Sequence, residues 1–125
     1  MLNGDKYTIL YDKTLIEHIL ERIAASLQIK KVIVATTTST ADDALCDLVR
    51  KAGFDYFRGN EENVLDRFYH AAKAFQGDII VRCTADDPFK DPEIIDKAID
   101  ILIKGQYDYC SNTIEPTYPE GLDIE

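Results

Sequence analysis

The sequence predicts an α/β fold with a mostly parallel sheet. Two apolar runs rich in β-branched residues, 30–36 and 78–83, alternate with longer segments whose apolar residues recur at helical spacing. Strands that alternate with helices of this length form βαβ units, in which helices cover a parallel sheet. A length of 125 residues corresponds to one domain, so residues 1–125 are expected to form a single domain.

The expected helices carry clear start and stop signals. Thr40 stands three residues before Asp43 at one helix start, and Gly53 marks the end of that helix. Asp91 is expected to cap the last helix, with Pro92 at its first position and no chemistry of its own. The third helix is expected to bury Val64, Leu65, Phe68, Ala71, Ala72 and Phe75. Helices are expected over residues 14–26, 40–53, 62–75 and 91–103.

The strand predictions differ in strength. Residues 30–36 and 78–83 are almost continuously apolar, which is typical of strands buried on both faces. Residues 54–57 and 107–112 are shorter strand candidates, and residues 7–11 are a further, weaker one.

Charge and cysteine content restrict the class of protein. The formal net charge is -9, which argues against a nucleic-acid partner because phosphates repel an acidic surface. Three widely spaced cysteines without a C-x-x-C pair are expected to be free thiols in a reducing cytoplasm. No apolar run approaches the length of a membrane span, so no membrane association is expected.

Polar residues follow three of the expected strands. In open parallel sheets, ligands bind beyond the carboxyl ends of the strands. This edge is expected to gather residues 36–38, the pair Asp86 and Asp87, and residues 111–112. Hydroxyl, amide and carboxylate oxygens suit Mg²⁺ and phosphate-bearing ligands rather than a soft metal. On the residues alone, a solvated turn is as good an interpretation of the aspartate pair as a metal site.

Four segments in order resemble the cytidylyltransferase family that includes spore coat polysaccharide biosynthesis protein F. They are "VIVATTTSTADDAL", "FRGNEENVLDRFYHAA", "DIIVRCTADDPFKDPEIIDKAI" and "YDYCSNTIEPTYPEGLDIE". The resemblance runs from about Lys13 to the last residue, and several linked motifs make it specific. It implies a three-layer α/β/α sandwich of the nucleotide-diphospho-sugar transferase type.

The resemblance also implies a site and a reaction. In the family the aspartate of a small-residue–Asp–x–Pro motif binds a catalytic Mg²⁺, and Asp86 occupies that position. Arg67 is expected either to reach a phosphate or acidic sugar as a catalytic residue, or to make a structural ion pair. The reaction would move a nucleotidyl group from CTP to a sugar or sugar acid. Nucleotide and sugar contacts are implied for Thr36, Thr37, Gly59, Asn60, Asp87 and Asp123.

One family feature is missing from this sequence. Family members carry a basic, glycine-containing loop of the form R-x-G-S-T-R-x-x-x-K, and no such motif precedes Lys13. The sequence therefore predicts a chain cut at both ends, with weak or no transferase activity, whose exposed sheet edge favours homo-oligomers. The alternative hypothesis is a non-catalytic α/β binding or assembly module.

Overall fold

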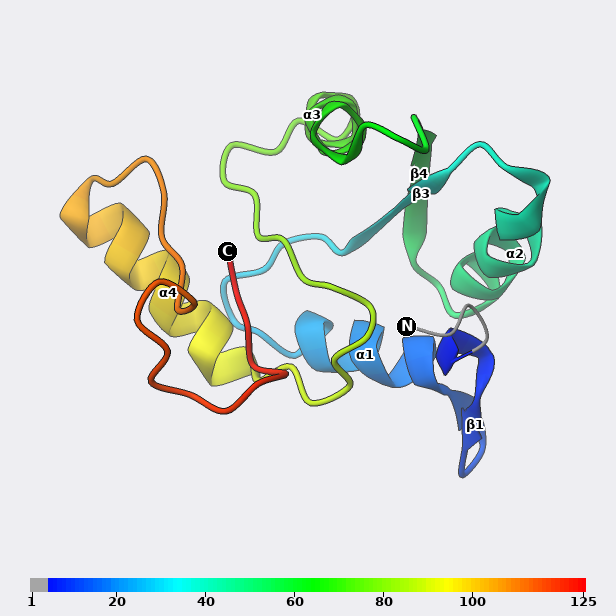
Figure 1. Ribbon diagram of the computed structural model, residues 1–125, viewed down its shortest axis with the longest axis horizontal. Helices are drawn as coiled ribbons and strands as arrows, with labels where there is room; N and C mark the ends of the chain where they lie inside the picture. The colour runs from blue at the N-terminus through cyan, green and yellow to red at the C-terminus, as the bar shows by residue number, and fades with distance from the viewer. Residues whose placement is uncertain (1–4) are drawn as a thin grey trace. The chain divides into compact units, whose positions relative to one another are not determined.

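The computed structural model describes residues 5–125, which form two compact units. One unit comprises residues 5–31 and 81–125, and the other comprises residues 32–80. Figure 1 shows the helices and strands of both units. The single-domain expectation stays a prediction.

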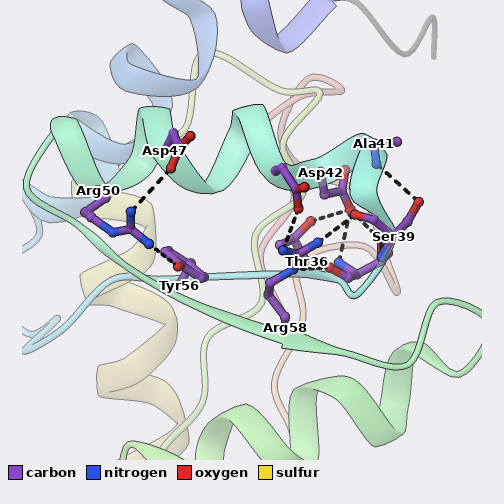
Figure 2. A network of polar contacts seen from close by, with 10 residues as sticks. Thr36, Ser39, Ala41, Asp42, Asp47, Arg50, Tyr56 and Arg58 are labelled. Carbon is purple, nitrogen blue, oxygen red and sulfur yellow. Dashed lines mark hydrogen bonds and ion pairs between the residues drawn. The ribbon is translucent and has the colours of Figure 1, made fainter.

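The unit of residues 32–80 is a βαβ arrangement. Strand β3 (Ile33–Thr37) pairs in parallel with β4 (Asp55–Gly59), so that Ile33 lies opposite Asp55 and Thr37 opposite Gly59. Helix α2 (Asp43–Lys51) contacts β4, and α3 (Val64–Ala74) contacts both strands. Figure 2 shows α2 on one side of the strands and α3 on the other. These layers confirm the predicted α/β fold with a parallel sheet.

Local sequence explains the start and end of these helices. A short 3-10 helix, η2 (Thr40–Asp42), leads into α2, which begins three residues later than expected. The chain leaves α2 through Gly53, whose φ of 84° is one that side-chain-bearing residues rarely adopt. At α3, the Asn63 side chain accepts a hydrogen bond from the backbone N–H of Asp66 at 3.0 Å.

The other unit is built on two packed helices, α1 (Leu15–Ala24) and α4 (Pro92–Gly105). A 3-10 helix, η1 (Asp5–Tyr7), and an antiparallel hairpin of β1 (Ile9–Leu10) and β2 (Lys13–Thr14) precede α1. The predicted cap of α4 is confirmed, because the Asp91 side chain accepts from the Glu93 N–H at 2.8 Å. The buried apolar residues of the two helices are Ile16, Ile19, Leu20, Ile23, Ile95 and Ile99.

Two of the strand predictions are wrong. Residues 78–83 and 107–112 contain no strand, and Ile79 and Ile80 are 44% and 47% exposed rather than buried. The backbone N–H of Arg82 donates to Glu125 O at 2.6 Å, and that of Asn112 donates to Ile124 O at 3.4 Å. These isolated bonds do not form a ladder, and a strand requires a neighbour that pairs along its length.

Burial differs from expectation in two places, and the weaker strand prediction has its own outcome. Residues 33–35 of β3 are only half-buried, so this strand is not enclosed on both faces. On α3, Val64 and Leu65 are exposed, and Ala71 is the buried position. Residues 9–10 form a strand, as the weaker prediction proposed, but it lies exposed in the hairpin. Among residues 5–125, no helix is long and apolar enough to cross a membrane.

Candidate functional site

The two adjacent carboxylates of the 84–90 loop have different surroundings. The Asp87 carboxylate accepts a hydrogen bond from the Thr84 hydroxyl at 3.0 Å. It also forms an ion pair with Lys90, whose Nζ lies 2.9 Å away. Asp86 is exposed, and it precedes Pro88 by two residues. The sequence alone treated the two aspartates as a pair, whereas the structure separates a bonded carboxylate from an exposed one.

Lys90 holds this loop against the last residues of the chain. Its side chain is fully buried, with a relative exposure of 0%. Besides Asp87, its ammonium group donates to the backbone carbonyl of Asp123 at 2.9 Å. The Lys90 carbonyl in turn accepts from Arg22 Nε at 2.7 Å. The amine therefore fixes the aspartate loop and the "GLD" segment, residues 121–123, in one place.

The "GLD" segment is also fixed from its other side. Asn112 donates from Nδ2 to Leu122 O at 2.8 Å and accepts at Oδ1 from the Ile124 N–H at 2.9 Å. Gly121 adopts a φ of 94°, and a Cβ there would lie 3.6 Å from Asp87 Oδ1. The structure thus brings the Gly121–Asp123 backbone beside the aspartate loop, with the Asp123 residue itself exposed.

The exposed aspartate is favoured in its ionised form. The pKa of Asp86 lies below its ordinary value, chiefly because of hydrogen bonding from the Thr84 hydroxyl, with a smaller contribution from the Lys90 charge. Burial raises the pKa of the neighbouring Cys83 thiol, so this group is not activated as a nucleophile.

The predicted threonines of the other unit face an aspartate. Both hydroxyls donate to Asp42 Oδ2, Thr36 at 2.7 Å and Thr37 at 2.6 Å, and the Thr37 N–H donates to the same oxygen at 3.1 Å (Figure 2). Thr36 is buried, with an exposure of 5%. These hydroxyl bonds therefore fix the turn that follows the carboxyl end of β3.

Arg58 stabilises the same turn, although no pattern in the sequence predicts this role. Its guanidinium donates to the carbonyls of Thr37 at 2.8 Å and Ser39 at 2.6 Å, and it pairs with Asp43 at 2.7 Å. A lone basic residue near the end of a strand gives no sequence signal for such contacts.

Arg67 lies against the predicted glycine loop. Its NH1 group donates to the carbonyls of Asn60 at 2.7 Å and Glu61 at 3.4 Å. A Cβ on Gly59 would come within 3.0 Å of Arg67 Cγ, so glycine permits this close packing. The Nε atom of Arg67 is buried without a hydrogen-bond partner. These contacts are made with backbone carbonyls, and the choice between the two expected roles of Arg67 stays a prediction.

The residues expected at one oxygen-rich edge belong to both units of the chain. Asp86, Asp87 and Asp123 lie in the unit of residues 5–31 and 81–125, whereas Thr36, Thr37, Gly59, Asn60 and Arg67 lie in the unit of residues 32–80. Within the described residues, no three His, Cys, Asp or Glu side chains converge as a metal-binding group. The three cysteines form no disulfide.

Comparison with known proteins identifies a family for this arrangement. A family model described as Cytidylyltransferase matches residues 2–121. Spore coat polysaccharide biosynthesis protein SpsF of Bacillus subtilis (strain 168) is 35% identical over 115 residues, covering 89% of this chain and 46% of that protein. An uncharacterized protein of Methanocaldococcus jannaschii is 44% identical over 102 residues, covering 82% of this chain and 42% of that protein.

Further matches agree with these. A 3-deoxy-manno-octulosonate cytidylyltransferase of Geobacter metallireducens is 32% identical over 102 residues, covering 80% of this chain and 39% of that protein. The solved structure of a cytidylyltransferase from Leptospira borgpetersenii serovar Hardjo-bovis superposes with a TM-score of 0.91 at 33% identity, covering 98% of this chain and 52% of that one. The chain spans less than half the length of these curated relatives. With a family model matched over nearly its whole length, this chain belongs to the cytidylyltransferase family.

Proposed function

We propose that this chain carries part of the active site of an enzyme that transfers a cytidylyl group from CTP to a sugar or sugar acid. The observation that carries the proposal is the family match over residues 2–121, which includes the exposed, ionised Asp86 and Gly121, the first residue of the "GLD" segment beside its loop. Relatives named as a spore coat polysaccharide biosynthesis protein and as a 3-deoxy-manno-octulosonate cytidylyltransferase support a surface polysaccharide as the destination of the sugar.

The donor groups fit Mg²⁺ as the cofactor. Magnesium in nucleotide enzymes is usually held by one or two carboxylates together with phosphate oxygens, rather than by a cage of protein ligands. The exposed carboxylate of Asp86 matches that pattern. Bound there, Mg²⁺ would supply positive charge against the phosphate oxygens.

The remaining residues would bind and orient the substrates. The turn after β3, fixed by the bonds from Thr36 and Thr37 to Asp42, offers its backbone to the nucleotide. Gly59 and Asn60, held by Arg67, offer a second backbone contact to the nucleotide or sugar. In this proposal Asp123 faces the sugar and Asp87 supports the loop that carries Asp86. The enzyme would act as a homo-oligomer in the cytoplasm.

The test is calorimetric titration of CTP, with and without Mg²⁺, into the chain and into Asp86→Asn. Nucleotide binding is the appropriate readout because the chain spans less than half of its curated relatives. We expect binding that requires Mg²⁺ and that weakens about tenfold or more in the variant, because a charged ligand contact is lost. Asp108→Asn, at an exposed aspartate outside the loop, is the matched control and should bind as the parent does.

Two results would contradict the proposal. Equal binding by the parent and Asp86→Asn would remove Asp86 from the site. No binding of CTP by the parent would favour the alternative of a non-catalytic α/β module, whose ligands would then be sought among proteins.

A further inference from the structure

We infer that Lys90 is a positioning residue that withholds Asp87 from cations and so leaves Asp86 as the one carboxylate that meets the metal. The inference rests on the proposed function and deepens it, because it predicts how the cation reaches the site. Lys90 would make this site weak for free Mg²⁺ and suited to Mg²⁺ that arrives already bound to CTP.

The first support is the geometry of the ion pair. Lys90 Nζ lies 2.9 Å from Asp87 Oδ2 and 2.9 Å from the carbonyl oxygen of Asp123. The Thr84 hydroxyl occupies the same Asp87 oxygen at 3.0 Å. One carboxylate oxygen thus accepts from an ammonium and a hydroxyl, and both donors would have to move for a dication to take that position.

The second support is the burial of the amine. A lysine with 0% exposure is unusual unless its charge is paired and its donors are satisfied. Asp87 is the carboxylate paired with it, at 24% side-chain exposure. Removal of either partner alone would leave a poorly solvated charge, so the pair holds Asp87 in place.

The third support is the electrostatic consequence. Two adjacent carboxylates with no counter-ion attract a divalent cation on their own, because each negative charge adds to the local potential. Lys90 cancels the charge of Asp87, and of the two adjacent carboxylates only Asp86 remains uncompensated. A single carboxylate holds Mg²⁺ weakly, and the phosphate oxygens of the nucleotide supply the ligands that complete the coordination.

The experiment measures the binding of Mn²⁺ alone, as a spectroscopic substitute for Mg²⁺, and of Mg²⁺ with CTP. The variants are Lys90→Met, the double variant Asp87→Asn with Lys90→Met, and Asp86→Asn. In Lys90→Met the released Asp87 should tighten Mn²⁺ binding about tenfold over the parent, because a second charge now faces the cation. A merely structural role for Lys90 would not raise metal affinity.

The double variant separates charge from folding. It removes both partners of the ion pair, so it should melt closer to the parent temperature than Lys90→Met does. Its Mn²⁺ affinity should return to within about twofold of the parent, whereas Asp86→Asn should lose Mn²⁺ binding. If Lys90→Met does not fold, the double variant still decides the question. A loss of Mn²⁺ affinity in the double variant, equal to that of Asp86→Asn, would show that Asp87 is itself a ligand and would overturn the inference.

The outcomes distinguish this inference from the proposed function. An unchanged Mn²⁺ affinity in a folded Lys90→Met variant overturns the role of Lys90, even where Mg²⁺·CTP binds the parent as proposed. Tighter Mn²⁺ binding in Lys90→Met supports that role, even where CTP fails to bind the parent and the proposed function fails.

Discussion

At the residue scale, one oxygen of Asp42 organises the turn after β3. It accepts two hydroxyl bonds and one backbone bond, and one of the hydroxyls belongs to Thr36, which is buried. A buried hydroxyl that loses its partner retains the full cost of its removal from water. The turn that we propose for nucleotide contact is therefore held chiefly by a charged acceptor, with Arg58 bonding its carbonyls from the neighbouring strand.

Replacement of this acceptor should destabilise the protein measurably. We expect Asp42→Ala to lower the free energy of unfolding by about 2 kcal/mol, because hydrogen bonds to a charged acceptor are lost and the Thr36 hydroxyl is left unsatisfied. Urea denaturation followed by circular dichroism would measure the change.

The control for this prediction lies on the helix that follows the turn. Asp47 makes an exposed ion pair with Arg50 at 3.3 Å, and such pairs contribute little. Asp47→Ala should therefore change the free energy of unfolding by less than about 0.5 kcal/mol. Equal effects of Asp42→Ala and Asp47→Ala would show that the three bonds to Asp42 carry no special weight.

The residue pattern placed Asp86 and Asp87 in one loop without distinguishing them, and only the family resemblance assigned the metal to Asp86. Their difference depends on a lysine three residues later that is buried, and on a carbonyl 33 residues further along from that lysine. Local spacing contains no information about which carboxylate such an amine will meet. The motif resemblance could therefore suggest Asp86 as a metal-binding aspartate, whereas the buried lysine that pairs with its neighbour Asp87 required the structure.

At the element scale, one carboxylate joins the end of α1 to α4. Asp96 accepts from the Ser26 hydroxyl at 2.5 Å and from the backbone N–H groups of Leu27 and Gln28, each at 3.1 Å. These donors belong to the chain just after α1 and favour the ionised carboxylate. The pKa of Asp96 is accordingly lowered, first by the Ser26 hydroxyl and then by the two backbone bonds.

This junction should make the free energy of unfolding depend on pH in the acidic range. Because the pKa of Asp96 is lower in the folded chain than in the unfolded chain, its contribution is complete above the unfolded pKa, about 4. The contribution disappears as the pH falls through the lower, folded pKa. We expect Asp96→Asn to be less stable than the parent at pH 7 and to lose stability less steeply below about pH 4.

Thermal melting of both proteins across this pH range would test the prediction. Asp108→Asn, at an exposed aspartate beyond α4, should follow the parent curve. Parallel curves for the parent and Asp96→Asn would contradict the assigned role of the junction.

The elements differ in how far the sequence could predict them. The start of α4 was predictable, because Asp91 and Pro92 act through local bonds that depend only on neighbouring residues. Strand β3 was also predictable, since its β-branched run has a parallel partner in β4. Residues 78–83 have a similar apolar run. Within the described residues, however, no strand pairs with this run, and the Arg82 N–H bonds to the carbonyl of Glu125 instead. Propensity alone does not make a strand without a neighbour.

At the scale of the whole molecule, two opposing features decide whether copies associate. Within residues 5–125 the parallel sheet contains two strands, so β3 and β4 each have one edge without a neighbouring strand. Such edges pair readily with another chain. The formal net charge of -9 acts in the other direction, because like-charged copies repel one another.

Salt should therefore promote self-association. Raising the ionic strength from about 0.1 M to about 1 M shortens the screening length from about 10 Å to about 3 Å, which weakens the repulsion but leaves backbone pairing at a sheet edge largely intact. We expect sedimentation velocity to detect a larger fraction of dimers or higher species at the higher salt concentration. Association that instead weakens with salt would indicate contacts between opposite charges, and a monomer under both conditions would remove the open edges as a source of assembly. The choice between these outcomes follows from the range of each force, since charge repulsion acts across the whole surface and strand pairing acts only at contact.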